Sequence, residues 1–358
     1  MSKNALLREV EPTKWRHLPH RFDLPHAVAF FFHDQLARLV VDLERTGALS
    51  VRFDLSEAER HEITNLRGED LWAWLESTGR RDVINDLTYR QLTAAVVSDA
   101  AHFLCEALIA SGKGKLSVAY SLLRKPLKES LLLLEWLCAG GDEFLARFHG
   151  ESSSAYVLNR LSRDEQRDIV ERAALLVDVP GVSAELLWVV RYGNQYPRSL
   201  ETMWTKATHL VTSAHASETE PGNLNFVFSS PSAKEEQWEH FYGVVPLLLY
   251  YFVVVSEAVA RRFVEWDEEL RGTQLLLRDL ALLRFTQWRS PDGAAVSELV
   301  ADLERISFPC TSCSGEVRVA QAEFDRFWLR AEIVCSGCGN SYSVWDIMSA
   351  DAKTDGEG

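Results

Sequence analysis

The stretch VVPLLLYYFVVV (244–255) is the longest uncharged apolar run in this chain of 358 residues. Its twelve residues are too few for the roughly 20 that a membrane-spanning helix needs, and Glu239 and Glu257 flank it closely. The run is therefore typical of a helix buried in a protein core. We expect it to form part of a long helical region over 235–289, with bends at Pro246 and Gly272.

Helical periodicity extends outward from this run over most of the chain. Apolar residues with spacings of three and four residues define one helix face that ends near Gly47: Val28, Phe32, Leu36, Leu39 and Leu43. Further helices are expected over 88–110, 115–138 (kinked at Pro126), 163–178, 183–192 and 199–213, and short strands over 49–55 and 224–228. Three capping-box patterns mark expected helix starts: Ser56 with Glu59, Thr88 with Gln91 and Ser162 with Glu165. The predicted fold class is mainly α, a multi-helix body.

The pattern changes near Phe308, where Gly, Ser and Cys clusters appear and apolar residues alternate with a period of two over 327–334. We interpret this region as a small β module. The predicted organisation is an irregular segment over 1–25, a helical domain over 26–305, the module over 306–350 and a disordered tail over 351–358.

The module carries two CxxC pairs, Cys310-Thr-Ser-Cys313 and Cys335-Ser-Gly-Cys338, separated by 21 residues. Two such pairs can complete a tetrahedral shell of four sulfurs around Zn²⁺. The intervening segments VRVAQAE and RFWLRAEIV are expected to form a hairpin that brings the pairs together. Four free thiols, a redox pair and an iron site are the alternatives.

Residues 308–348 resemble the zinc ribbon family, in which four cysteines are structural ligands. The resemblance implies one structural zinc ion per chain, held by Cys310, Cys313, Cys335 and Cys338, with no coordination position left for catalysis. Cys105 and Cys138 lie in apolar helical runs and are expected to be core thiols. No export signal is visible in the sequence, so we expect reduced cysteines and a soluble cytoplasmic protein.

Charge argues against nucleic acid as a partner. The formal net charge is −14, and residues 308–358 contribute −4 of it, although a phosphate-binding ribbon should be basic. Within the module, Trp328, Tyr342 and Trp345 are either its small core or an exposed patch for contact with another protein. The partners we expect are a second protein or further copies of this chain.

A polar stripe interrupts the otherwise apolar helix 88–110, and a second one follows on 115–138. If residues 111–114 form a tight turn, residues equidistant from position 113 face each other. His102 then faces Arg124, Asp99 faces Lys128 and Glu106 faces Ser121. This predicts either an ion-pair network between the two helices or a polar pocket for acid–base chemistry. Its candidate catalytic residues are Asp99, His102, Glu106, Arg124 and Lys128.

The stretches YSLLRKPLKESLLLLEWL (120–137) and WTKATHLVTSAH (204–215) resemble uncharacterised bacterial all-helical proteins that are HEPN-like or related to abortive infection. The resemblance implies a role in bacterial stress or phage defence, with a HEPN-like ribonuclease or hydrolase as an alternative function. HEPN ribonucleases use an Arg-x4-His motif on a helix. Only Arg21 and His26 match that spacing here, and Pro25 between them disfavours a position inside a helix.

Other catalytic signatures are absent from the sequence. It contains no P-loop, no dinucleotide-binding glycine motif, no GxSxG elbow and no HExxH helix. The histidines at 17, 20, 26 and 33 and the pair at 209 and 215 have no supporting metal ligand at a suitable spacing. The predicted function is therefore an interaction or regulatory module, and a nucleic-acid-linked regulator is the further alternative.

Overall fold

The computed structural model describes residues 17–150, 152–196, 198–213, 215–227, 229–290, 307–318 and 324–343. Helices dominate these residues, which confirms the mainly α fold class. The longer helices are α2 (Asp23–Arg45), α5 (Arg81–Gly112), α7 (Leu131–Phe148), α8 (Arg163–Val177), α11 (Pro231–Ala260) and α12 (Glu268–Arg289). The shorter ones are α3 (Glu57–Ile63), α4 (Glu69–Ser77), α6 (Leu116–Arg124), α9 (Ala184–Tyr192) and α10 (Leu200–Thr208). The expected tail at 351–358 and most of the expected irregular segment at 1–25 lie outside the described residues.

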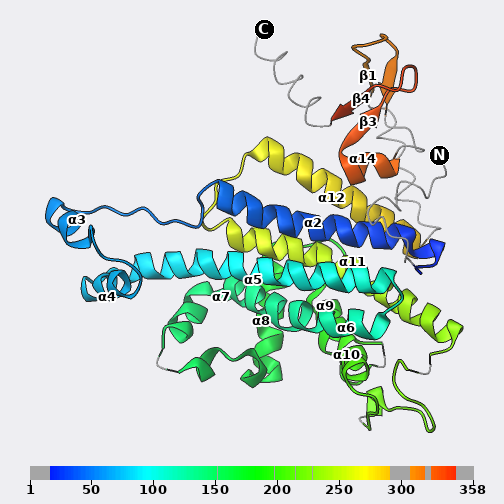
Figure 1. Cartoon of the computed structure of the whole chain (residues 1–358), viewed down its shortest axis with the longest axis horizontal. Coiled ribbons are helices and arrows are strands. Elements are labelled where there is room, and N and C mark those ends of the chain that lie inside the picture. The colour runs from blue at the N-terminus through cyan, green and yellow to red at the C-terminus, as the bar shows by residue number, and fades with distance from the viewer. Residues whose placement is uncertain are drawn as a thin grey trace.

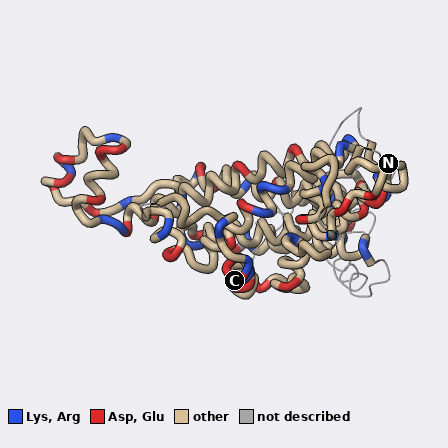
Figure 2. Tube along the Cα trace, turned by 90° about the horizontal axis from the view of Figure 1, so that it is seen from below, with Lys and Arg blue, Asp and Glu red and all other residues tan. Residues whose placement is uncertain are grey.

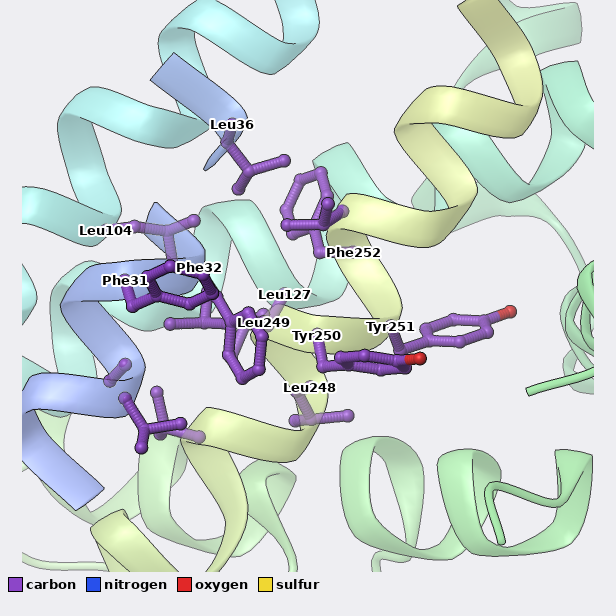
Figure 3. Close-up of a cluster of buried hydrophobic side chains, with 14 of the residues drawn as sticks. Phe31, Phe32, Leu36, Leu104, Leu127, Leu248, Leu249, Tyr250, Tyr251 and Phe252 are labelled. Atoms are coloured by element: carbon purple, nitrogen blue, oxygen red, sulfur yellow. The ribbon is translucent and has the colours of Figure 1, made fainter. Parts of the chain in front are cut away.

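The helical body is elongated, with α2, α5, α11 and α12 running along its length (Figure 1). Helix α2 packs on α5 and α11, while α7 and α8 cover the other side of α11. Side chains from α2, α5 and α11 meet in the centre, where Phe32, Leu104 and Leu249 are completely buried (Figure 3). The uncharged apolar run at 244–255 thus lies inside the helical core, as its sequence predicts.

Two helices, α5 and α11, are long and apolar enough to cross a membrane. Of the most apolar window of each, 67% of α11 and 44% of α5 is buried inside the structure. The exposed face of α5 carries polar residues such as His102 and Glu106. Burial of the apolar faces against other helices is the pattern of core helices in a soluble protein.

Local sequence patterns correctly predict the starts of two helices. Ser56 and Ser162 each form a complete capping box with the glutamate three residues later, at the starts of α3 and α8. The prediction at Thr88 is wrong, because α5 begins at Arg81 and Thr88 lies buried in its interior. Helix α2 begins at Asp23, three residues earlier than predicted, because proline is tolerated in a first helical turn.

Several other predicted elements differ in the structure. Residues 50–56 and residue 224 have no regular secondary structure, and residues 225–227 form a turn, so neither described segment is a strand. Helix α10 ends at Thr208 rather than 213. The helical region over 235–289 is two helices, because the chain leaves helical geometry between Ala260 and Glu268. Pro246 lies inside α11, which continues through it, and Gly272 lies inside α12.

The helical region that follows α5 is interrupted at Pro126, where the sequence predicts a kink. Between α6 and α7 the segment η2 (Lys125–Ser130) is π-helical, with Pro126 at its start. A π segment inserts one extra residue into a helix and rotates everything that follows it. The segment η2 contacts α5, and its first residue, Lys125, pairs with Asp99 of α5.

Helices α3 and α4 project from the end of the body (Figure 1). They have a small core of their own, in which Leu75 packs with Val83 and Ile84 at the start of α5. Arg80 bonds to Glu59 at 2.6 Å and so ties α3 to the beginning of α5. Positively and negatively charged residues are interspersed along the described part of the chain, this projection included (Figure 2).

The C-terminal module has two antiparallel strand pairs. β1 (Ser307–Pro309) pairs with β2 (Glu316–Arg318), and β3 (Glu332–Val334) pairs with β4 (Ser341–Ser343). Between them, α14 (Phe324–Arg330) is helical, so the predicted strand alternation over 327–334 is wrong for its first four residues. Helix α14 packs on α12 and α2 and joins the module to the body.

Candidate metal centre

The two CxxC pairs converge on one point in the C-terminal module. The Sγ atoms of the four cysteines all lie within 4.8 Å of one another. Two of the separations cross between the pairs, 3.6 Å from Cys310 to Cys338 and 3.7 Å from Cys313 to Cys335. A tetrahedral ion with metal–sulfur bonds of about 2.3 Å places its sulfurs about 3.8 Å apart. The cluster therefore has the size and the donor set of a tetrathiolate metal site.

Each CxxC pair is built on the same backbone loop. The amide of Cys310 donates to the carbonyl of Gly315 at 2.7 Å, and the amide of Cys335 donates to that of Asn340 at 2.8 Å. The return bonds also match, from Ser314 N to Cys310 O and from Gly339 N to Cys335 O, both at 2.9 Å. Two copies of one loop thus present their cysteines to a common centre.

The residues after each pair permit this curvature. Ser314 and Gly339, both four residues after the first cysteine of their pair, have positive φ angles of 56° and 76°. Gly315 lies so close to the cluster that a Cβ atom there would be 3.2 Å from the Cys313 sulfur. A larger residue at 315 would push against the ligand shell.

Hydrogen bonds prepare Cys310 to act as a thiolate. The Tyr342 hydroxyl lies 3.0 Å from its sulfur, and the Ser312 amide donates to the same atom at 3.4 Å. The Tyr342 hydrogen bond lowers the pKa of Cys310 to about 6, since it stabilises the charged form. A backbone hydrogen bond from Gly315 lowers the pKa of Cys313, but bonds with the neighbouring thiols outweigh it and raise that pKa to about 12. A bound cation would therefore stabilise the negatively charged thiolate forms of these cysteines.

In each of the two loops, one cysteine is buried and the other is exposed. The first cysteine of each pair, Cys310 and Cys335, is buried, whereas Cys313 and Cys338 are exposed. Four protein sulfurs fill a tetrahedral shell, so the site leaves no open position for a substrate or a water nucleophile.

Helix α14 fixes this module to the helical body. Trp328 is completely buried and contacts the edge of Phe31 in α2, with ring centroids 5.5 Å apart. Trp328 is therefore core, not an exposed contact residue. Tyr342 is half-buried beside Cys310, and Trp345 lies outside the described residues.

The polar stripe of α5 is placed differently from the prediction. Asp99 pairs with Lys125 at 2.7 Å, rather than with Lys128, and both side chains are nearly half exposed. Lys128 pairs with Glu201 of α10. His102, Glu106 and Arg124 are exposed. The predicted pairing of Asp99 with Lys128 is therefore wrong, because Lys128 lies in the π segment η2 and pairs with a carboxylate of α10 instead.

A buried ion pair that the sequence did not single out lies nearby. Glu135 of α7 and Arg191 of α9 are completely buried and bond at 2.6 Å. Arg191 also donates to the carbonyl of Leu127 in the π segment and to the hydroxyl of Tyr192. The apolar surroundings of Glu135 in sequence were its only signal, because a carboxylate inside a leucine run needs a buried partner.

The other cysteines, and the histidines near the N-terminus, lie outside this cluster. Cys105 and Cys138 are half-buried, and burial raises the pKa of Cys138 to about 11. His26 is buried against the Tyr242 hydroxyl at 2.6 Å, while Arg21 precedes α2 and is exposed, so the Arg-x4-His spacing forms no joint site. His20 and His33 pair with Asp23 and Asp34. Among the described residues, the four cysteines are the one group of three or more metal-ligating side chains close enough to share an ion.

Comparison of the chain with models of protein families, with curated proteins and with solved structures found no match. The metal centre therefore rests on its own geometry.

Proposed function

We propose that this chain is a zinc protein in which Cys310, Cys313, Cys335 and Cys338 hold one structural Zn²⁺ ion. The observation that carries the proposal is the pair of cross-loop sulfur separations, 3.6 and 3.7 Å, which match a tetrahedral tetrathiolate shell. A module this small buries little apolar surface, so binding of the metal supplies much of its folding free energy. Iron would fit the same donor set, and metal analysis separates the two.

We further propose that the protein acts by binding other protein chains. Its metal shell is closed, so the centre supports structure rather than chemistry on a substrate. Near the end of α8, Leu175 and Leu176 are 79% and 63% exposed, and they offer apolar surface to a second protein. Analytical ultracentrifugation of the wild type and a Leu175→Ser/Leu176→Ser variant tests a homo-oligomer: we expect self-association that the variant loses.

The resemblance of residues 120–137 and 204–215 to abortive-infection proteins motivates a setting in bacterial stress or phage defence. Challenge of expressing cells with phage tests it: protection that the metal-ligand variant loses supports the setting, and no protection contradicts it.

Metal analysis of the purified protein tests the zinc site directly. We expect about one zinc and little iron per chain. The double variant Cys310→Ser/Cys313→Ser should lose the metal, and the matched variant Cys105→Ser/Cys138→Ser should keep it. A wild-type content far below one zinc per chain, together with unchanged folding of the ligand variant, contradicts the proposal.

A further inference from the structure

A second site lies at the end of the body where α2 begins, α12 ends and α11 begins (Figure 1). A cavity of about 500 Å³ opens there. Three arginines from three separate elements line it: Arg21 of η1 (His20–Phe22), Arg198 of the loop before α10, and Arg289, the last residue of α12. All three are exposed. Arginine side chains that line one cavity are suited to bind a phosphate there.

An aromatic surface lies beside these arginines. Trp288 lines the cavity, and its Nε1 donates to the carbonyl of Arg21 at 2.8 Å, which fixes the orientation of the indole. Phe285 stacks on Trp288 at 6.0 Å, and Phe22 packs against it at 6.1 Å. The half-buried indole thus lines the cavity with one hydrogen bond and two ring contacts to orient it, and an aromatic ring in a cavity wall can stack with a flat ring.

Two carboxylates line the same cavity. Glu236 and Glu239 lie in α11, and both are exposed. Arg21 has a further acidic neighbour, with its Nη2 3.5 Å from the carboxylate of Glu235. An inorganic anion alone gains nothing from carboxylates nearby. A ligand that carries both an anionic group and hydrogen-bond donors suits this mixture.

His240 lines the cavity, and contacts of both its ring nitrogens hold it in place. Its Nδ1 lies 2.7 Å from the Tyr120 hydroxyl, and its Nε2 donates to the carbonyl of Arg198 at 2.7 Å. Burial lowers its pKa, so the imidazole is neutral at pH 7. A neighbouring cavity of about 340 Å³ shares Arg198, Glu236 and His240 with the first, which leaves room for a ligand longer than a single ring.

We propose that this cavity binds a guanine nucleotide. The base stacks on Trp288, the phosphate meets Arg198 and Arg289, and the N1–H and N2 amino donors of guanine face Glu236 and Glu239. Adenine presents an acceptor where guanine presents its N1–H donor, so the two carboxylates discriminate against it. The proposal is independent of the metal centre and of the proposed role in protein interaction.

Calorimetric titration of the full-length protein with GMP, AMP and inorganic phosphate tests the site. We expect GMP to bind most tightly. Arg198→Ala and Arg289→Ala should each weaken GMP binding roughly tenfold, the loss expected for one charge-assisted hydrogen bond. The matched control is Arg45→Ala, an exposed arginine at the opposite end of α2, and it should leave GMP affinity unchanged.

Further measurements test the role of the two carboxylates and the choice of guanine separately. The double variant Glu236→Gln/Glu239→Gln should remove the preference for GMP over AMP while keeping its fold by circular dichroism. Three results overturn the proposal: no GMP binding at millimolar concentration, GMP binding that the arginine variants leave intact, or phosphate binding as tight as GMP binding. Equal wild-type affinity for AMP and GMP overturns the assignment of guanine.

Discussion

Arg284 of α12 donates two hydrogen bonds to the carboxylate of Asp325 in α14, from Nε at 2.9 Å and from Nη2 at 3.1 Å. Both side chains are more than three-quarters buried, at 23% and 21% exposed. Asp325 also accepts a hydrogen bond at 3.1 Å from the indole of Trp328. One carboxylate therefore connects the body, the docking helix and its buried tryptophan, and it couples the metal module to the helices beneath.

Replacing Asp325 with alanine should loosen this docking. The change leaves the largely buried Arg284 guanidinium and the Trp328 indole without their acceptor, at a cost of about 1–3 kcal/mol. We expect faster amide exchange over 324–330 with little change in α5. Thr286→Ala, at an exposed position of α12, is the control. Equal exchange in Asp325→Ala and wild type would show that the pair does not hold the module.

Trp328 should contribute more to stability than any exposed aromatic residue of the module. Trp328→Ala removes a fully buried ring against Phe31 and should lower the free energy of unfolding by about 3–5 kcal/mol. Chemical denaturation of the zinc-loaded protein measures this loss, and Trp328→Phe should recover part of it. A loss below 1 kcal/mol would contradict the core position of the ring.

Zinc affinity should fall as the pH falls, because the metal binds thiolates and must displace protons. Tyr342 lowers the pKa of Cys310 to about 6, while the pKa of Cys313 is raised to about 12. Between these values, binding releases protons and affinity rises with pH. Competition with a chelator at pH 6, 7 and 8 measures the slope. Tyr342→Phe removes the hydrogen bond and should weaken binding near pH 7, and an affinity independent of pH would exclude thiol ligation.

Removing one charge of the buried Glu135–Arg191 pair should destabilise the fold more than removing both. Glu135→Leu leaves the Arg191 charge buried without its partner and should destabilise the fold by about 3–5 kcal/mol. The double variant Glu135→Leu/Arg191→Met removes both charges and should recover most of that loss. Urea denaturation of the two variants and the wild type measures the difference. A double variant no more stable than the single one would show that the other bonds of Arg191 matter more than the pair.

The projection formed by α3 and α4 should loosen in acid. Hydrogen bonds from Arg80 and Ser56 lower the pKa of Glu59 from 4.5 to about 2. A lowered carboxyl pKa stabilises the folded state above the unfolded value, and this stabilisation is lost as the pH falls from about 4.5 through 2. NMR of residues 56–80 should show disorder at low pH before the core of the body unfolds. Glu59→Gln should show the same disorder at pH 7.

Features of this fold can be predicted from the sequence where their signal lies within a few neighbouring residues. The cysteine pairs and the capping boxes at Ser56 and Ser162 are complete within a few residues, and the structure confirms their geometry. Thr88 and Gln91 have the same spacing, but a capping pattern inside a continuing helix has no free amides to cap.

Positions decided by tertiary structure could not be predicted in this way. Phe324, Phe327 and Trp328 fit a helix face as well as the strand alternation that includes Phe327 and Leu329, and packing on α12 selects the helix. Counting outward from the hairpin turn paired Asp99 with Lys128. In the structure its partner is Lys125, one turn closer to the hairpin, and Lys128 pairs with Glu201 of α10, a helix whose position no count along the hairpin could include. The arginines of the second cavity are nearly 270 residues apart at their extremes, and only the fold brings them together.

The central position of α11 has a consequence for how the chain is made. Helices α2, α5 and α7, against which α11 is buried, all precede it in sequence. During synthesis the N-terminal helices emerge first, so the most apolar segment leaves the ribosome when its packing surface already exists. A circular permutant that begins at α11 would expose the same segment before any of these partners had been made. We expect that chain to aggregate or to be drawn to membranes, although its contacts once folded would be the same.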